Sequence, residues 1–256
     1  MKTHSPYLKN AVTVKKIGNQ IKITQHKALR QKGWEQEKPR QKRGTASDRK
    51  SQGNISKAIR SINNIGKQNN WVWWCNFNLD ATKIDRYDFM NFKKTFLKFI
   101  ANQNRYRCSN RKIKYLIVFG IGNNDAWHAH AFITGLDESD LSTTKVNDNI
   151  SYHWDKYEKN FGFSYILPLT NVDYRIAYMV DNVKKVSERT ELLNMRLYYS
   201  SKNLTPKETL LFSGTNVKFK KAIPWTYTNI NGYCRTSILN AKKYSWTDFI
   251  EIPEEN

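Results

Sequence analysis

Two histidines separated by one alanine, His128 and His130, stand in the stretch WHAHAFI. The apolar residues around them predict a β-strand, in which residues i and i+2 project from the same face. The two imidazoles should therefore point together, about 6–7 Å apart at Cα, with the alanines facing the other way. Such a pair can bind one divalent ion, and with a carboxylate and open positions the ion stays reactive. Taken alone, HxH is a weak motif, and an incidental pair is the plainer interpretation.

Hydrophobic periodicity predicts the elements that must position this pair. Helices are predicted at 55–68, 85–103 and 172–186, with a short helical turn at 155–160. Strands are predicted at 71–79, 114–119, 128–134, 162–167, 209–213, 216–219 and 234–239. Asp80, Thr82 or Asp85 could cap the second helix. This order fits an α+β fold with a central antiparallel sheet and helices packed on one face.

The charge of the chain indicates a polyanionic partner. Its 256 residues carry a formal net charge of +21, and most of that excess lies in residues 1–70. Nucleic acid is the usual partner of so basic a chain, although a solvated basic surface is the alternative. The residues expected to contact phosphates are Arg40, Lys42, Arg43, Arg49 and Lys50. A flexible, solvated tail is an equally good interpretation of those five residues.

Several protein classes are excluded by composition. No run of about 18 apolar residues exists, so we expect no membrane-spanning helix. The first residues lack the apolar region of a secretory signal, which predicts a cytoplasmic protein. The three cysteines show no CxxC pairing, which argues against a zinc ribbon and a disulfide framework.

Four segments in order resemble the HUH rolling-circle replication initiators, the Rep proteins of bacterial plasmids and phages. KYLIV, a short polar loop and WHAHAFI resemble the histidine-pair motif of that family. NFNLDATKIDRYD (76–88) resembles its first motif, and RIAYMVDNVKKV (175–186) its tyrosine motif. LYYSSKNLTPKE (197–208) is similar to the segment that follows the tyrosine helix in Firmicute-type members. The resemblance spans about residues 55–210.

The resemblance implies a single-strand DNA endonuclease that depends on Mg²⁺ or Mn²⁺. Tyr178 would attack a phosphate of single-stranded or hairpin origin DNA, leaving a 5′-phosphotyrosine link and a free 3′-OH. Tyr174, one turn earlier, is the rival nucleophile. Lys185 shares the helix face of Tyr178 and could stabilise the phosphate, while Lys184 is a further DNA contact. Trp127, beside the histidines, could pack against the metal site or the DNA.

The resemblance also implies partners, and composition along the chain predicts the domain limits. No GxxxxGK[ST] motif is present, so unwinding would come from a host helicase. A nucleoid-associated protein of a bacterial host is expected, while the oligomeric state stays open. We expect a loosely ordered basic arm at 1–53 with a short hairpin near 12–23. An HUH-like domain at 54–220 and a C-terminal extension at 221–256, packed on that domain, should follow.

Three positions depart from the family pattern. Gly120 stands where the family carries an acidic third metal ligand, so Asp125 is the nearest carboxylate. Softer oxygen donors are also available, from Asn76, Asn78, Asn123 and Asn124. Asn182 replaces a second tyrosine, and Asp181 replaces a lysine whose charge Lys185 could restore.

Two interpretations remain after these departures. The chain is a one-tyrosine nickase with a rearranged third ligand, or a degenerate relative that binds DNA or RNA without cleaving it. The nickase leads, because His128, His130, Tyr178 and Lys185 are all present.

Overall fold

The computed structural model describes residues 7–30, 52–146, 149–189, 192, 195–205, 208–212, 218–228 and 234–251. The chain forms two compact units. One comprises residues 46–205, and the other combines residues 1–45 with 206–256. The predicted boundaries near 53 and 220 are therefore wrong, because the two ends of the chain share one unit.

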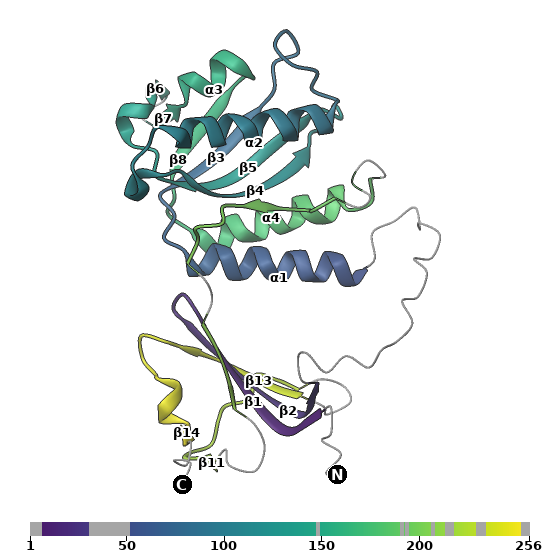
Figure 1. The fold of residues 1–256 in the computed structure, drawn as a ribbon, viewed down its shortest axis with the longest axis vertical. Coiled ribbons are helices and arrows are strands. Elements are labelled where there is room, and N and C mark those ends of the chain that lie inside the picture. The colour runs from purple at the N-terminus through teal and green to yellow at the C-terminus, as the bar shows by residue number, and fades with distance from the viewer. Residues whose placement is uncertain are drawn as a thin grey trace. The chain divides into compact units, whose positions relative to one another are not determined.

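The unit of residues 46–205 is built on a seven-stranded sheet (Figure 1). Its strand order is β6-β7-β8-β3-β5-β4-β9, and every recorded pairing is antiparallel. The strands are β3 (Trp73–Asn78), β4 (Lys114–Ile121), β5 (Trp127–Thr134), β6 (Ser142–Val146), β7 (Asn149–His153), β8 (Ser164–Pro168) and β9 (Tyr199–Ser200). The antiparallel α+β class predicted from the sequence is confirmed. The β6–β7 hairpin was not predicted.

Helices cover both faces of this sheet, so the prediction of helices on one face is wrong (Figure 1). They are α1 (Gln52–Gln68), α2 (Phe89–Arg105), α3 (Asp155–Asn160) and α4 (Val172–Val186). The physical reason lies in the central strands, which bury apolar side chains on both faces and need cover on both. No helix of the described segments is long and apolar enough to cross a membrane.

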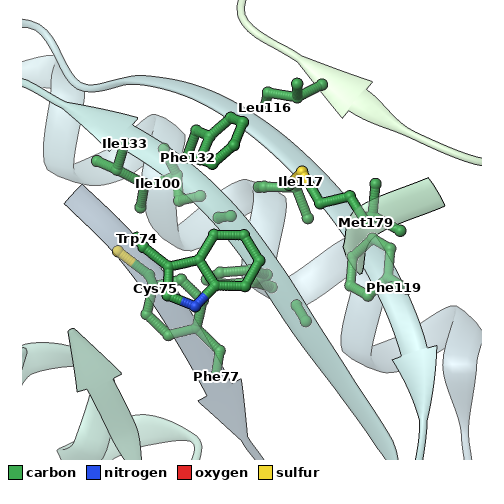
Figure 2. Packing of buried hydrophobic residues seen from close by; sticks show 14 of the residues in the cluster. Trp74, Cys75, Phe77, Ile100, Leu116, Ile117, Phe119, Phe132, Ile133 and Met179 are labelled. Carbon is green, nitrogen blue, oxygen red and sulfur yellow. The ribbon is translucent and has the colours of Figure 1, made fainter. Parts of the chain in front are cut away.

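Helix α2 packs its aromatic stripe on the face that carries Phe77 and Phe119. The rings of Phe77 and Phe96 lie 5.0 Å apart, and those of Phe92 and Phe119 lie 5.3 Å apart. Figure 2 shows this part of the core, with Phe77 on β3 and Phe119 on β4, the two strands that flank β5. Asp88 caps the helix by accepting from the Asn91 amide, so the three predicted caps are wrong. The segment before Asp88 forms turns of its own, which delay the start of the helix.

Helices α1 and α4 cover the opposite face, which carries His128, His130 and Phe132. The alternation predicted for β5 is confirmed, since Ala129 and Ala131 are fully buried on the α2 side. Gly66 of α1 lets the two helices approach closely. A Cβ on Gly66 would lie 2.6 Å from Cδ1 of Ile176 in α4 and 3.4 Å from the Phe132 ring.

The second unit contains a five-stranded antiparallel sheet in the order β10-β1-β2-β13-β12. Its strands are β1 (Tyr7–Ile17), β2 (Gln20–Arg30), β10 (Glu208–Phe212), β12 (Tyr227–Thr228) and β13 (Cys234–Asn240). A short ladder joins β11 (Lys218–Phe219) to β14 (Ile250–Glu251). The predicted hairpin is confirmed and is longer than expected, so the loosely ordered arm is wrong over 7–30. The C-terminal extension pairs β13 with β2 of that hairpin, because alternating apolar residues on both segments share one core.

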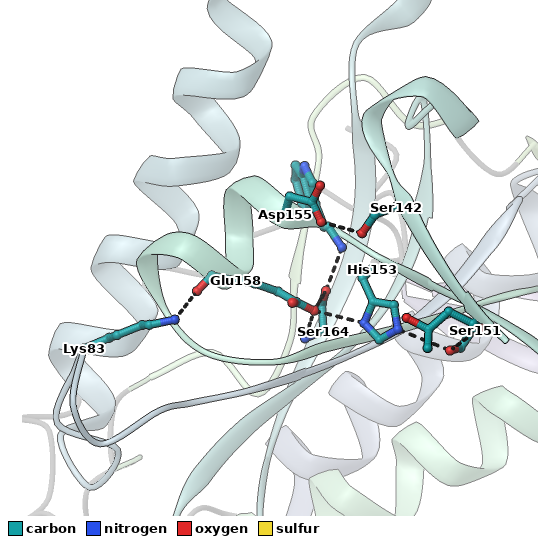
Figure 3. Close-up of polar contacts among 9 residues, drawn as sticks. Lys83, Ser142, Ser151, His153, Asp155, Glu158 and Ser164 are labelled. Carbon is teal, nitrogen blue, oxygen red and sulfur yellow. Dashed lines mark hydrogen bonds and ion pairs between the residues drawn. The ribbon is translucent and has the colours of Figure 1, made fainter. Parts of the chain in front are cut away.

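Glu158 fastens the short helix α3 to the strands beside it (Figure 3). Its Oε1 accepts from the Ser164 amide at 2.9 Å and from Ser164 Oγ at 2.8 Å. His153 Nδ1 lies 3.1 Å from the same oxygen. Ser164 is fully buried, so one carboxylate oxygen satisfies donors that water does not reach.

Replacing Glu158 should therefore test this attachment. Glu158→Ala leaves the Ser164 donors without their acceptor and should lower the free energy of unfolding by about 1–3 kcal/mol. Glu158→Gln keeps a side-chain oxygen and should cost less than half as much. Urea unfolding of both variants measures the difference, with the exposed Lys156→Ala as a control on the same helix. Equal losses for Glu158→Ala and Glu158→Gln would contradict the assignment.

Candidate active site

The candidate site lies on three neighbouring strands of the larger sheet. In β5, His130 pairs with Asn76 of β3, and His128 pairs with Gly120 of β4. Directly paired residues of antiparallel strands project from the same face, so these side chains share one surface. The two imidazole centroids lie 4.7 Å apart. The sequence prediction that both histidines point together is therefore confirmed.

His130 is held by two neighbours on β3. Its Nδ1 lies 2.5 Å from Oδ1 of Asn76, and its ring stacks on Trp74 with centroids 5.6 Å apart and planes 5° apart. An amide oxygen only accepts, so Nδ1 carries the proton and Nε2 carries a lone pair. That Nε2 is buried and has no hydrogen-bond partner among the described residues. A metal ligand needs this arrangement, with one ring nitrogen oriented by an acceptor and the other bare.

Both imidazoles are neutral at pH 7. Burial lowers the pKa of His130 to about 3, with smaller contributions from His128 and Arg175. Burial also lowers the pKa of His128, and Lys185 adds to that, while a hydrogen bond with the Ala126 backbone raises it. Neutral imidazoles keep the lone pairs that a cation requires.

Tyr178 reaches the histidines from α4. Its ring lies 4.8 Å from the His130 ring, edge to face, and 5.9 Å from the Trp74 ring. The residue is 42% exposed, so a ligand can reach part of its surface. Tyr174 is 61% exposed, and no ring contact joins it to either histidine among the described residues. The geometry favours Tyr178 over its rival.

The space beside Gly120 is filled by atoms of His128 and Asn182. A Cβ built on Gly120 would lie 2.6 Å from Nε2 of His128 and 2.6 Å from Oδ1 of Asn182. Asn182 is buried, and its amide nitrogen donates to the Tyr178 carbonyl at 3.0 Å. This hydrogen bond directs the amide oxygen toward the histidine. Asn182 is thus an oxygen donor at the pair that sequence reasoning missed, because it counted only as an absent tyrosine.

Asp125 is not brought to the histidines, so its prediction as third ligand is not supported by the geometry. It lies in the β4–β5 turn with a left-handed backbone (φ 59°). Its carboxylate pairs with Arg189 at 3.2 Å and is 71% exposed. No cluster of three His, Cys, Asp or Glu side chains suited to a metal occurs within the described segments. Asn76 is engaged with His130, and Asn123 and Asn124 lie in the same turn as Asp125.

Two cations lie near the site. Arg175 stacks over the Trp74 ring at 5.0 Å, and its charge acts on His130. Sequence reasoning missed Arg175, although it stands three residues before Tyr178, where a helix places neighbours. The charge of Lys185 acts on His128, as expected of a residue on that helix face. Lys184, rather than Lys185, pairs with Asp181 at 3.3 Å.

Trp127 faces away from the site, so its predicted contact with metal or DNA is wrong. It is 2% exposed, and its ring packs 4.5 Å from Phe89 of α2. The residue precedes His128 by one position, and strand alternation turns it to the opposite face. Arg40, Lys42, Arg43, Arg49 and Lys50 lie outside the described residues.

A second polar row, Ser151–His153–Glu158, has the order of a hydrolase triad but not its accessibility (Figure 3). Ser151 Oγ lies 3.2 Å from His153 Nε2, and it also donates to the Thr144 carbonyl at 3.2 Å. Ser151 and His153 are each 8% exposed. The buried hydroxyl has a carbonyl for its proton, and Glu158 already serves Ser164, so the row is structural.

Comparison of the chain with protein-family models, curated proteins and solved structures finds no match in any of the three.

The bond between Asn76 and His130 should control metal affinity. Asn76→Ala frees the imidazole to rotate and to change tautomer, which should weaken Mn²⁺ binding about 10–100-fold. Asn76→Asp retains an acceptor and should bind at least as tightly as the unaltered chain. Free Mn²⁺ measured by electron paramagnetic resonance reports the affinity. Unchanged binding in Asn76→Ala, or in His130→Ala, would show that the pair is not a metal site.

The close packing of Gly120 and Asn182 predicts that substitutions at these two positions have non-additive effects on the free energy of unfolding. Gly120→Asp forces a side chain against Asn182 and His128, and should cost about 1–3 kcal/mol of stability. Asn182→Ala removes one obstructing group, so the double variant should lose less than the sum of the single losses. Denaturant unfolding of the four proteins measures this. Additive losses would mean that the two side chains do not compete for the same space.

Proposed function

We propose that this chain is an HUH-type single-strand DNA endonuclease that initiates rolling-circle replication. In this proposal Tyr178 attacks a backbone phosphate held beside His128 and His130. The observation that carries it is the bare, buried Nε2 of His130, which has no partner among the described residues and lies beside the tyrosine ring. Leaving such a group unsatisfied is costly, so a ligand at that atom is expected.

The residues fit a divalent cation, Mg²⁺ or Mn²⁺, although the ligand set is not the family's. His128 and His130 would hold the ion, and Asn182 Oδ1 offers a neutral oxygen in place of a carboxylate. When bound, such an ion neutralises charge that develops on phosphate oxygens. The remaining ligands would come from water and from the DNA phosphate itself.

The covalent step needs only groups near the site. The Tyr178 hydroxyl loses its proton and its oxygen bonds to phosphorus, while the bond from phosphorus to the 3′ oxygen breaks. The 3′ oxygen takes up a proton and leaves as a 3′-OH, and the 5′ phosphate stays on the tyrosine. A phenol with a pKa near 10 is a weak nucleophile at pH 7, so it depends on nearby positive charge.

Arg175 and Lys185 are suited to supply that charge. Arg175 has no carboxylate ion pair among the described residues and is held in place by stacking on Trp74. A guanidinium so placed can bind two phosphate oxygens at once. Asp181 should repel a bound phosphate less than its position suggests, because Lys184 forms an ion pair with its carboxylate. Lys184 is then a weaker candidate for DNA contact than Lys185.

A catalytically degenerate protein that only binds DNA or RNA is the second candidate. It is favoured by the surroundings of Gly120, where His128 and Asn182 leave no room for a side chain and none of the neighbouring groups among the described residues is a carboxylate. Two neutral imidazoles and an amide attract a cation less than a set that includes an acid. One tyrosine also limits the chain to a single cleavage and transfer in one site.

The decisive experiment is covalent trapping of DNA. The chain is incubated with Mn²⁺ and labelled single-stranded origin DNA of its replicon, and adducts that survive denaturation are counted. We expect an adduct that Tyr178→Phe abolishes and Tyr174→Phe retains, because only the first tyrosine contacts a histidine.

The other outcomes separate the candidates. An adduct that persists in Tyr178→Phe would disprove the nucleophile. Tight DNA binding with no adduct from any variant would support the degenerate protein instead.

A further inference from the structure

A cavity in the smaller unit has the lining of a site for one planar ring. It has a volume of about 220 Å³ and lies beside the end of β1 and the segment after β13. Buried Val14 and Ile21 contribute apolar surface, and half-buried Tyr244 and Trp246 supply the aromatic part of the lining. The volume is below the roughly 300–1,000 Å³ of pockets that enclose drug-sized ligands, so one ring system suits it better.

Exposed lysines gather around this cavity. Lys16 lines it, while Lys242 and Lys243 occupy the turn that carries Tyr244. That turn is tied to the β1–β2 turn by a hydrogen bond from the Ala241 amide to the Asn19 carbonyl at 2.7 Å. The Lys243 ammonium lies 5.3 Å from the centre of the Tyr244 ring. One lysine therefore lines this cavity, and two more stand in the turn that leads to its aromatic lining.

The surrounding segments reinforce that charge. The acidic residues in the described part of this unit are Glu208, Asp248 and Glu251, and Asp248 accepts from the Ser245 amide. Lysines and arginines outnumber them several-fold in the same segments. An uncharged aromatic ligand would need only the cavity, and a simple anion only the lysines. A ligand with alternating rings and phosphates uses both.

We propose that this unit binds single-stranded nucleic acid, with one base inserted beside Tyr244 and Trp246 and flanking phosphates on the lysines. Base stacking on aromatic side chains together with a basic surface is how single strands are held without sequence readout. A duplex keeps its bases paired and cannot insert one without cost, so the cavity selects single strands. This inference does not rest on the nuclease chemistry, because it involves none of the residues of the histidine site.

The test uses the full chain and fluorescence anisotropy of a labelled oligothymidine. Trp246→Ala should weaken binding about tenfold, whereas Trp246→Phe should restore most of the affinity. An abasic strand of equal length should bind Trp246→Ala and the unaltered chain alike. A duplex of the same length should compete poorly.

The lysines are tested by salt dependence. Replacing Lys16, Lys242 and Lys243 together with alanine should reduce the slope of log affinity against log salt by about 2, at about 0.7 per phosphate contact. The matched control replaces Lys57, Lys94 and Lys98, which are exposed on helices of the other unit. This control has the same net charge and should change the slope by less than half as much.

The results that would overturn the proposal are distinct from a failure of the nuclease. Equal binding by Trp246→Ala and the unaltered chain, equal effects of the two lysine triples, or duplex binding as tight as single-strand binding would each reject it. In a chain carrying His128→Ala and His130→Ala, Trp246→Ala should still weaken oligothymidine binding about tenfold. Loss of that effect would place the strand at the histidines rather than at this cavity.

Discussion

The position of one imidazole determines what the candidate site can do. His130 is stacked on Trp74 and bonded through Nδ1 to Asn76, so neither its plane nor its tautomer is free to change. The lone pair on its Nε2 consequently points in one fixed direction. The register between β3 and β5 creates this arrangement, because it sets Asn76 directly opposite His130. A shift of one residue would turn every one of these side chains to the other face.

The packing of α4 on that face decides which partners the imidazoles meet. Tyr178 and Asn182 are one helical turn apart and both reach the pair, one through its ring and the other through its amide oxygen. Glycine at position 120 is the condition for this approach, since any side chain there would occupy the space of the amide. The residues at positions 120 and 182 are therefore coupled, because Asn182 fills the space that a side chain at position 120 would need.

Hydrophobic periodicity and composition correctly predicted the features that depend on short stretches of sequence. The ranges of α3 and α4, the direction of the histidines and the burial of Trp71, Trp73 and Trp74 all follow from periodicity and composition. The sequence could not show that residues 20–26 pair with residues 234–240, because that contact joins segments near the two ends of the chain. It also favoured Asp125 by nearness in sequence, whereas a turn directs that carboxylate to Arg189. Trp127 was misjudged for the same reason, since nearness to His128 outweighed strand alternation.

The neutral ligand set has a further consequence under the proposed function. Two uncharged imidazoles and an amide offer no negative charge to a divalent ion, while Arg175 and Lys185 repel it. A DNA phosphate reverses the balance, because it attracts the ion and both cations together. Cation and DNA should therefore bind cooperatively, each raising the affinity of the other by the same factor. A site that lacks its acidic ligand would then be completed by its own substrate, which limits the nucleophile to acting when DNA is present.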